Sequence, residues 1–264
     1  MKMLAGFTAL LFCFPNLAAQ QVAAPTPRDP QALAVLSQML SVTGWGSVQP
    51  QDVVATGIVT RFHGDSQDAV AIKLESLGPR MYRSDVQDQT GTITTTLNGD
   101  GASVVSSSSS RLLPSYVAIP MRSTAFPFFA GFLSFTDPSS TVTYDGIETI
   151  AGQASYRIDL AFQPAGSDSV SLMRAKASQI TIWISVATAL PVQIEYSRTS
   201  NENPNSSRRI TQTFSDYRTV GGIQMPFHQE EFGGGRTIFT LQLSAVNLNT
   251  GVASTDFALP TIQD

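Results

Sequence analysis

Short stretches of alternating apolar and polar residues recur between residues 141 and 260. Within residues 155–162, for example, Ile158 and Leu160 fall on one face of an extended chain while Arg157 falls on the other. A period of two is typical of antiparallel strands that bury one face. Several such strands in succession can bury their apolar faces only in a sandwich or a barrel. The pattern therefore predicts a mainly β protein with few helices.

Turn residues divide most of the chain into further strands. Asn98 to Gly101 is one strong turn signal and the glycines at 233–235 are another, because Asn, Asp and Gly tolerate the backbone angles of tight turns. The serine run 106–110 and residues 201–207 are predicted loops. The expected strands are 53–61, 69–76, 80–87, 92–97, 102–107, one from 141 onward, 155–162, 179–186, 191–198, 208–220, 223–232 and 237–248.

One helix is predicted near the start of the folded region. Asp29 followed by Pro30 is a helix-start signal, because Asp caps free backbone amides and Pro suits the first helical position. Gly44 ends the segment. We expect the helix to cover one face of the sheet. Its apolar positions at helical spacing are Leu33, Leu36 and Leu40.

Residues 112–135 break the strand pattern. Pro114, Pro120 and Pro127 interrupt this phenylalanine-rich segment, which excludes a membrane-spanning helix and favours short helices joined by kinks. Such a segment could form a helical lid over the concave face of a bent sheet; alternatively, its aromatic side chains belong to the core. The candidate ligand contacts in this segment are Phe126, Phe128, Phe129, Phe132 and Phe135.

Trp183 is a further candidate ligand contact. It alternates out of phase with Ile182 and Ile184, so it occupies the opposite face of its predicted strand. A large indole ring on a solvated face would be uncommon. We therefore expect Trp183 either inside a barrel or at the mouth of its cavity, where its fluorescence would respond to an apolar ligand.

The first residues resemble an export signal. Lys2 precedes an apolar stretch at residues 3–14, and residues 17–19 end in two alanines that suit signal-peptide cleavage. The only cysteine, Cys13, lies in this stretch after Phe12, whereas a lipid anchor needs a small residue before the cysteine. The alternatives are a buried N-terminal helix and a lipidated Cys13.

The predicted organisation is a signal peptide at 1–19, a flexible spacer at 20–28 and a single domain at 29–264. Disulfides and zinc sites with Cys ligands are excluded for the predicted mature chain, because residues 20–264 contain no cysteine. A sequence pI of about 5.1 with scattered Lys and Arg argues against a nucleic-acid surface. No apolar run after residue 19 is long enough to cross a membrane.

No catalytic, metal or cofactor site is predicted. The two histidines, His63 and His228, lie near predicted strand ends without a surrounding motif, so we interpret them as surface or strand-end residues rather than as bases or metal ligands. The sequence also contains no G-x-S-x-G nucleophile turn, S-x-x-K box or phosphate-binding loop. A pair of catalytic carboxylates stays possible, but no pair stands out.

Three groups of segments carry a resemblance to a known family. Residues 80–85 with 91–101 resemble a strand followed by a strand that ends in a D-G turn, and residues 144–158 resemble a central G-x-E-x-(apolar)-x-G hairpin. The third group comprises 182–185, 189–192, 214–218, 222–227, 246–247 and 257–260. In this order, the three groups are similar to the LolA/LolB-like superfamily of lipoprotein-sorting proteins and periplasmic lipoprotein carriers.

The resemblance implies a half-open barrel in which a strongly curved antiparallel sheet wraps around helices and an apolar cavity. In the carriers, that cavity holds the acyl chains of a lipoprotein in transit. The chain departs from the family in its large phenylalanine-rich segment and in its serine run, and the carriers' functional residues have no position-by-position match.

We therefore expect an exported, periplasmic or extracellular, non-enzymatic protein that binds or carries a lipid, an acylated protein or another apolar ligand. Envelope proteins are possible partners, and nucleic acids are not expected. One alternative is a structural or interaction module of the envelope whose cavity is filled by its own side chains. The other is a hydrolase with an unrecognised site.

Overall fold

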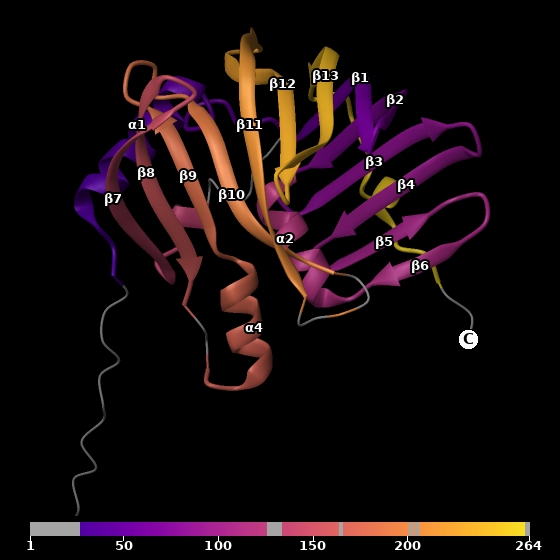
Figure 1. Cartoon of the computed structure of the whole chain (residues 1–264), viewed down its shortest axis with the longest axis horizontal. Coiled ribbons are helices and arrows are strands. Elements are labelled where there is room, and N and C mark those ends of the chain that lie inside the picture. Colours follow the sequence, from indigo (N-terminus) through magenta and orange to yellow (C-terminus); the bar gives the residue numbers. More distant parts are fainter. Residues whose placement is uncertain (1–26, 126–133, 164–165, 201–202, 204–205, 262–264) are drawn as a thin grey trace, which may run out of the picture.

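The computed structural model describes residues 27–125, 134–163, 166–200, 203 and 206–261. These residues form one antiparallel sheet of 13 strands that bends around the helices α1 (Pro30–Thr43) and α2 (Ser115–Thr124) (Figure 1). The sheet does not close, because its two edge strands, β6 (Ser110–Leu113) and β7 (Ser140–Ile150), do not pair with each other. The mainly β, half-open barrel expected from the sequence is confirmed.

The sheet consists of two meanders that meet where the first strand pairs with the last. The order across it is β6-β5-β4-β3-β2-β1-β13-β12-β11-β10-β9-β8-β7. The remaining strands are β1 (Asp52–His63), β2 (Ser66–Leu77), β3 (Met81–Asp88), β4 (Gly91–Asn98), β5 (Gly101–Val105), β8 (Gln153–Phe162), β9 (Ile180–Ser185), β10 (Pro191–Thr199), β11 (Ser207–Val220), β12 (Ile223–Gly233) and β13 (Arg236–Leu248). The short helical elements are η1 (Ser134–Thr136), α4 (Ser169–Ala177) and η2 (Ser254–Phe257).

The topology explains why α2 lies inside the curve of the sheet. The strands β6 and β7 are consecutive in sequence but lie at opposite edges, so the segment between them has to pass from one edge to the other. Along that path α2 contacts β4 and β5 on one side and β10 on the other. The helix therefore bridges the two halves of the curved sheet.

The helix α1 forms where the sequence predicts it. The Asp29 side chain accepts hydrogen bonds from the backbone amides of Gln31 and Ala32, at 2.7 and 3.1 Å, and thereby caps the first turn. Gly44 ends the helix with a φ of +79°, and a Cβ atom there would lie 2.2 Å from the carbonyl oxygen of Gly222. Only glycine fits this left-handed turn against the backbone of the β11–β12 connection.

The main core lies between α1 and the concave face of the C-terminal half of the sheet. Contacts of α1 reach β7 and β12, and the buried side chains of the helix belong to the same cluster as those of the strands. A smaller cluster of Leu97, Ala102 and Ala118 joins α2 to β4 and β5. Large side chains of the main core that are almost fully buried include Leu36, Met39, Ile158, Ile182, Ile194 and Met225.

Three details differ from or extend the sequence interpretation. The serine run begins as a turn, in which the Ser106 amide donates to the Ser109 carbonyl at 2.7 Å, but Ser110 already belongs to β6. The helix α4 was not expected from the sequence. Arg28, the last residue of the predicted spacer, forms a parallel bridge with Val142 of the edge strand β7, in which the Val142 amide donates to the Pro27 carbonyl and the Asp29 amide donates to the Val142 carbonyl. Within the described part of the chain, every helix is too short or too polar to cross a lipid bilayer.

Candidate functional site

An apolar cavity of about 290 Å³ lies on the concave face of the sheet, beneath α2. Side chains of β1, β2, β3 and β13 form its apolar wall, and α2 contributes Met121 with the adjoining Ala125. Residues of β10, β11 and β12 form the opposite wall. The apolar wall consists of Val59, Ile72, Leu74, Tyr82, Val86, Phe239 and Leu241.

Strand alternation explains why these side chains point into the cavity. Val59 pairs with Val70 and Gly57 with Ile72 in the β1–β2 register, so the two strands present their apolar positions to the same face. Leu74 is buried, but Ile72 and Val86 are only half-buried although they lie on the core-facing side. Apolar side chains that face inward without being covered mark space for a ligand.

The helix α2 separates this cavity from a neighbouring one of about 250 Å³. Met121 lines both cavities, while Val117 and Pro120 line only the second. The two cavities therefore meet at Met121 of α2. Pro120 lies inside the helix and leaves it without one backbone donor.

A buried polar cluster forms part of the opposite wall. Glu231, with 2% of its surface exposed, accepts a hydrogen bond of 3.0 Å from the Tyr196 hydroxyl. The Arg198 guanidinium binds both carboxylate oxygens of Glu231, at 2.8 and 2.6 Å, and donates to the Tyr196 oxygen at 2.7 Å. A bidentate arginine–carboxylate pair is a strong and geometrically specific contact, so this cluster is held rigidly.

The cluster also sets the protonation of its members. Burial raises the pKa of the Tyr196 hydroxyl, so the ring stays neutral. Burial disfavours the charged form of Arg198, but its bonds to Glu231 outweigh this effect and raise the arginine pKa. Across the cavity, burial raises the pKa of Tyr82 to about 12, against a lowering contribution from a hydrogen bond with Ser84. The cavity therefore presents neutral phenols, the compensated Arg198–Glu231 pair and Arg61, which is paired with Asp68.

A second polar pair lies deeper on the same wall. The Gln212 side-chain amide donates to the Gln229 carbonyl oxygen at 2.7 Å, and both side chains are buried. Among the described residues, none accepts a hydrogen bond from Gln229 Nε2. A buried amide that lacks an acceptor costs about 1–3 kcal/mol, so a ligand oxygen placed there would be stabilised.

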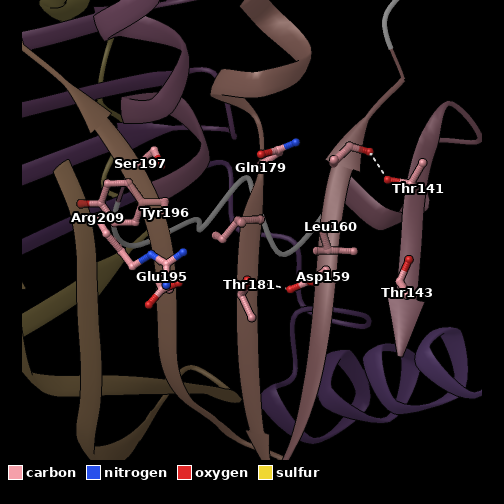
Figure 2. Close-up of a pocket in the computed structure, with 12 residues that line it drawn as sticks. Thr141, Thr143, Asp159, Leu160, Gln179, Thr181, Glu195, Tyr196, Ser197 and Arg209 are labelled. Atoms are coloured by element: carbon pink, nitrogen blue, oxygen red, sulfur yellow. Dashed lines mark hydrogen bonds and ion pairs between the residues drawn. The ribbon is translucent and has the colours of Figure 1, made fainter. Parts of the chain in front are cut away.

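The opposite face of the same strands has a different character. A hollow of about 290 Å³ lies there between β7 and β11 and is lined mainly by polar groups (Figure 2). Thr181 Oγ1 donates to Asp159 Oδ1 at 2.6 Å, and Arg209 Nε lies 3.3 Å from Glu195 Oε1. Burial raises the pKa of Asp159 and a hydrogen bond with Asp145 adds to this, against a lowering by the Thr181 bond. This hollow does not suit an acyl chain.

Comparisons with known proteins agree with this architecture. No family model and no curated protein matches the sequence. Among solved structures, a domain described as an outer membrane lipoprotein-sorting protein from Vibrio parahaemolyticus matches with a TM-score of 0.57 at 14% identity, over 86% of this chain and 96% of that one. A LolA superfamily protein from Nitrosomonas europaea matches with a TM-score of 0.56 at 13% identity, over 84% and 97% of the two chains.

A DUF1329 family protein from Desulfovibrio piger also matches, with a TM-score of 0.56 at 12% identity and coverage of 88% and 98%. The chain has a LolA-like fold. At these identities the likeness concerns the fold alone, so ligand and pathway have to be argued from the residues of this chain. In the LolA-like half-barrel described above, the space between the curved sheet and α2 is the candidate site.

Most of the aromatic residues singled out in the sequence do not help to define this site. Phe126, Phe128, Phe129 and Phe132 lie outside the described residues. Phe135 is 5% exposed and belongs to the main core, in agreement with the alternative interpretation of its segment. It does not line the cavity beneath α2. Ligand contact by these phenylalanines stays a prediction.

Trp183 lies on the outer face of β9, opposite the core residue Ile182. The expected placements, inside the barrel or at the cavity mouth, differ from the observed one, although the ring is only 5% exposed. Its Nε1 donates to Glu148 Oε2 at 2.8 Å, and the Arg157 guanidinium covers the ring at 5.7 Å from its centre. A cation–π contact and a hydrogen bond thus shelter the indole on the outer surface. A ligand contact of Trp183 stays a prediction.

Each histidine has an acidic neighbour. His63 ends β1, as expected, and its Nε2 lies 3.1 Å from Asp68 Oδ1. His228 lies within β12 rather than at its end, with Nε2 3.0 Å from Glu230 Oε1. Neither histidine lines the cavity. Among the described residues, no group of three or more His, Cys, Asp or Glu side chains could hold a metal ion.

The sequence analysis missed the polar wall of the cavity. The sequence contained a signal, because polar residues of β10, β11 and β12 stand at positions where the strand alternation places apolar ones. In β12, Gln229 and Glu231 continue the series of Met225 and Phe227, and in β11 Gln212 follows Ile210. A polar side chain on a core-facing position marks a buried network or a ligand contact.

Proposed function

We propose that this protein is an exported, non-enzymatic binding or carrier protein that holds a lipid, an acylated protein or another apolar ligand on the concave face of its sheet. The observation that carries the proposal is the uncovered apolar wall beneath α2. There, Ile72, Val86 and Phe239 face inward and remain half-buried. Filling this space would remove apolar surface from water at about 25 cal/mol per Å².

The size of the space supports a small ligand or one acyl chain. The cavity of about 290 Å³ lies near the lower end of the usual range for ligand pockets, about 300–1,000 Å³. The neighbouring cavity beyond α2 adds about 250 Å³. The described lipoprotein-sorting role of the Vibrio parahaemolyticus domain, which shares the fold, fits a ligand of this class. We propose that α2 acts as the lid between the two spaces.

Mass spectrometry of organic extracts from natively purified protein tests the proposal directly. A stoichiometric lipid or acylated ligand is the expected result. Protein that is reproducibly empty and that fails to bind added alkyl compounds would favour the alternative of an envelope structural module. Turnover of model esters by purified protein would favour the hydrolase alternative.

A matched pair of variants locates the ligand. Ile72→Glu places a charge in the apolar wall, whereas Ala71→Glu places the same charge on the exposed outer face of the same strand. Titration with the neutral fluorescent probe N-phenylnaphthylamine should show at least about tenfold weaker binding for Ile72→Glu, because an uncompensated buried charge is expensive. Binding should be unchanged for Ala71→Glu. Equal binding by both variants would place the ligand elsewhere.

A further inference from the structure

A larger hollow, of about 1290 Å³, adjoins the apolar cavity at the ends of three hairpins. The β1–β2 turn contributes Phe62 and Gly64, while β11 and the β12–β13 turn contribute Ile210 and Gly234. Arg198 lines this hollow and both cavities beside α2. The hollow therefore adjoins the candidate ligand space at Arg198, and we call it the mouth. Its charged lining consists of Arg198, Arg208, Arg236 and Asp65.

The three arginines point to the same face of the sheet. Arg198 and Arg208 lie directly opposite each other in the β10–β11 register, in phase with the core residues Ile194 and Ile210. Arg236 pairs with Gly233 on the same face of β12 and β13. Like charges directly opposite each other in a sheet are unfavourable, and Glu231 compensates only Arg198 of this pair.

Among the described residues, Arg198 alone of these three arginines has an acidic partner. Glu231 holds Arg198 in the bidentate pair described above. Among the residues that the structure describes, Arg208 and Arg236 form no ion pair. On the opposite rim, Arg61 already neutralises acidic groups, because it bonds to Asp68 and lies 3.9 Å from Asp88.

The glycine turn at residues 233–235, between β12 and β13, leaves room for the Arg208 side chain. A Cβ atom at Gly233 would lie 2.9 Å from Arg208 Cδ, and one at Gly234 would lie 3.6 Å from its guanidinium carbon. The absence of side chains at these glycines therefore allows the Arg208 side chain to lie across the turn. This brings its guanidinium to the side of the hollow where Arg236 begins β13.

The Nε2 donor of Gln229 lies further inward on the core-facing side of β12. The core-facing positions of this strand run inward from Gly233 at the mouth to Glu231 and then to Gln229. Gln229 is 1% exposed and lines the cavity, and its Nε2 has no partner within the part of the chain that the structure describes. At about 3.3 Å per residue, the donor lies roughly 13 Å along the strand from the glycine turn. It can serve an oxygen atom of a ligand that extends inward from the mouth.

We propose that the mouth binds an anionic head group, a phosphate or a carboxylate, of an acyl ligand whose chain occupies the apolar cavity. This inference rests on the proposed function. Arg208 and Arg236 bind the anion, because the guanidinium fork matches both phosphate and carboxylate oxygens. Arg198 stays with Glu231 and forms the boundary between the charged mouth and the apolar cavity. Gln229 Nε2 donates to an acceptor oxygen further along the ligand.

Calorimetric titration with dodecyl phosphate, dodecanol and inorganic phosphate, each below micelle concentration, tests this inference. Dodecyl phosphate should bind at least about tenfold more tightly than dodecanol, since charge-assisted bonds contribute about 1.5–3 kcal/mol. The double variant Arg208→Gln/Arg236→Gln should abolish this difference and leave dodecanol binding unchanged. Arg209→Gln is the matched control, because Arg209 lies on the outer face of the same strand and bonds to Glu195.

The outcomes separate the two proposals. Equal affinity for dodecyl phosphate and dodecanol would overturn the anion site but leave the apolar-ligand function in place, whereas binding of neither compound would overturn both. Displacement of dodecyl phosphate by inorganic phosphate supports a shared anion site. Inorganic phosphate that binds with equal affinity in the double variant, or that leaves dodecyl phosphate bound, would overturn the assignment to Arg208 and Arg236.

Discussion

The two halves of the concave face are built from the same kind of strand, but their inward-facing apolar side chains differ in how far they are buried. In the C-terminal half, α1 seals the face, and Ile158, Ile182 and Ile194 have no exposed surface. In the N-terminal half, Ile72 and Val86 occupy equivalent inward positions of β2 and β3 yet remain half-buried. Coverage by a helix therefore decides whether an apolar strand face becomes core or a cavity wall.

The helix over the N-terminal half, α2, contacts β4, β5 and β10. Side chains of β1, β2 and β3 line the cavity beneath it. One half of the concave face is thus closed as core, and the other lines the cavity.

The largest expected effect separates the two halves by stability. Ile182→Ala removes a fully buried side chain and should lower the free energy of unfolding by about 3 kcal/mol, because the rigid core cannot collapse around the void. Ile72→Ala removes the same atoms from the cavity wall and should cost about 1 kcal/mol. Urea unfolding of both variants measures the difference. Equal losses would show that the cavity is filled by the protein itself.

A second effect concerns the polar wall between the halves. Glu231→Gln removes the charge that compensates Arg198 and should cost about 2 kcal/mol in urea unfolding, because bonds to charged groups are the stronger ones. Glu230→Gln is the matched control on the outer face of β12, where the 37% exposed Glu230 side chain bonds to His228. It should change stability by less than about 0.5 kcal/mol. A similar cost for both variants would contradict a structural role of the buried pair.

Much of the fold could be predicted from the sequence, because it depends on local patterns. The alternation of Ile180, Ile182 and Ile184 defines β9, and Asp29 with Pro30 defines the start of α1. By contrast, α4 has no strong apolar face and sits in a polar stretch, so its pattern gave no helix signal. The four-residue strand β6 depends on pairing with β5 rather than on its own serine-containing sequence.

The site was harder to predict because it depends on tertiary coverage. The pattern places Ile72 and Ile182 in the same class of inward positions, and only the packing of α1 distinguishes them. From its size, the indole of Trp183 is expected inside the barrel or at the cavity mouth, but Arg157 and Glu148, distant in sequence, shelter it outside. Gln229 and Glu231 were a usable signal, because they are polar residues at positions of β12 where the alternation places buried apolar ones.

A smaller expected effect is the pH dependence of stability that Asp159 in the outer hollow contributes. The raised pKa of Asp159 means that the folded state favours its protonated form, so this contribution to stability is present below the unfolded pKa of about 3.9 and is lost as the pH rises through the folded pKa. Asp159→Asn mimics the protonated form. It should be more stable than the wild type at neutral pH and equally stable near pH 3, with a smaller effect than the two losses above.

Asp68→Asn gives the opposite sign and serves as the control. A hydrogen bond from Arg61 lowers the pKa of Asp68, so its stabilising contribution is present above the unfolded pKa and is lost as the pH falls through the folded one. This variant should therefore be less stable than the wild type at neutral pH, and the difference should vanish in acid. Thermal unfolding at both pH values measures both variants; the same sign for the two would contradict the assignment.

The smallest expected effect is spectroscopic and compares the two faces of the sheet. In a Trp45→Phe variant, Trp183 reports on the outer face, where Arg157 and Glu148 already hold the ring. With the ring held there, its emission should stay constant unless a ligand binds to the outer face. Adding Trp183→Phe and Phe239→Trp moves the only indole to the cavity wall. On titration with dodecanol, emission from the second variant should shift to shorter wavelength, because the ligand displaces water from the ring, while emission from the first should stay constant. A shift in the first variant alone would place the apolar ligand on the outer face and reverse the roles assigned to the two sides of the sheet.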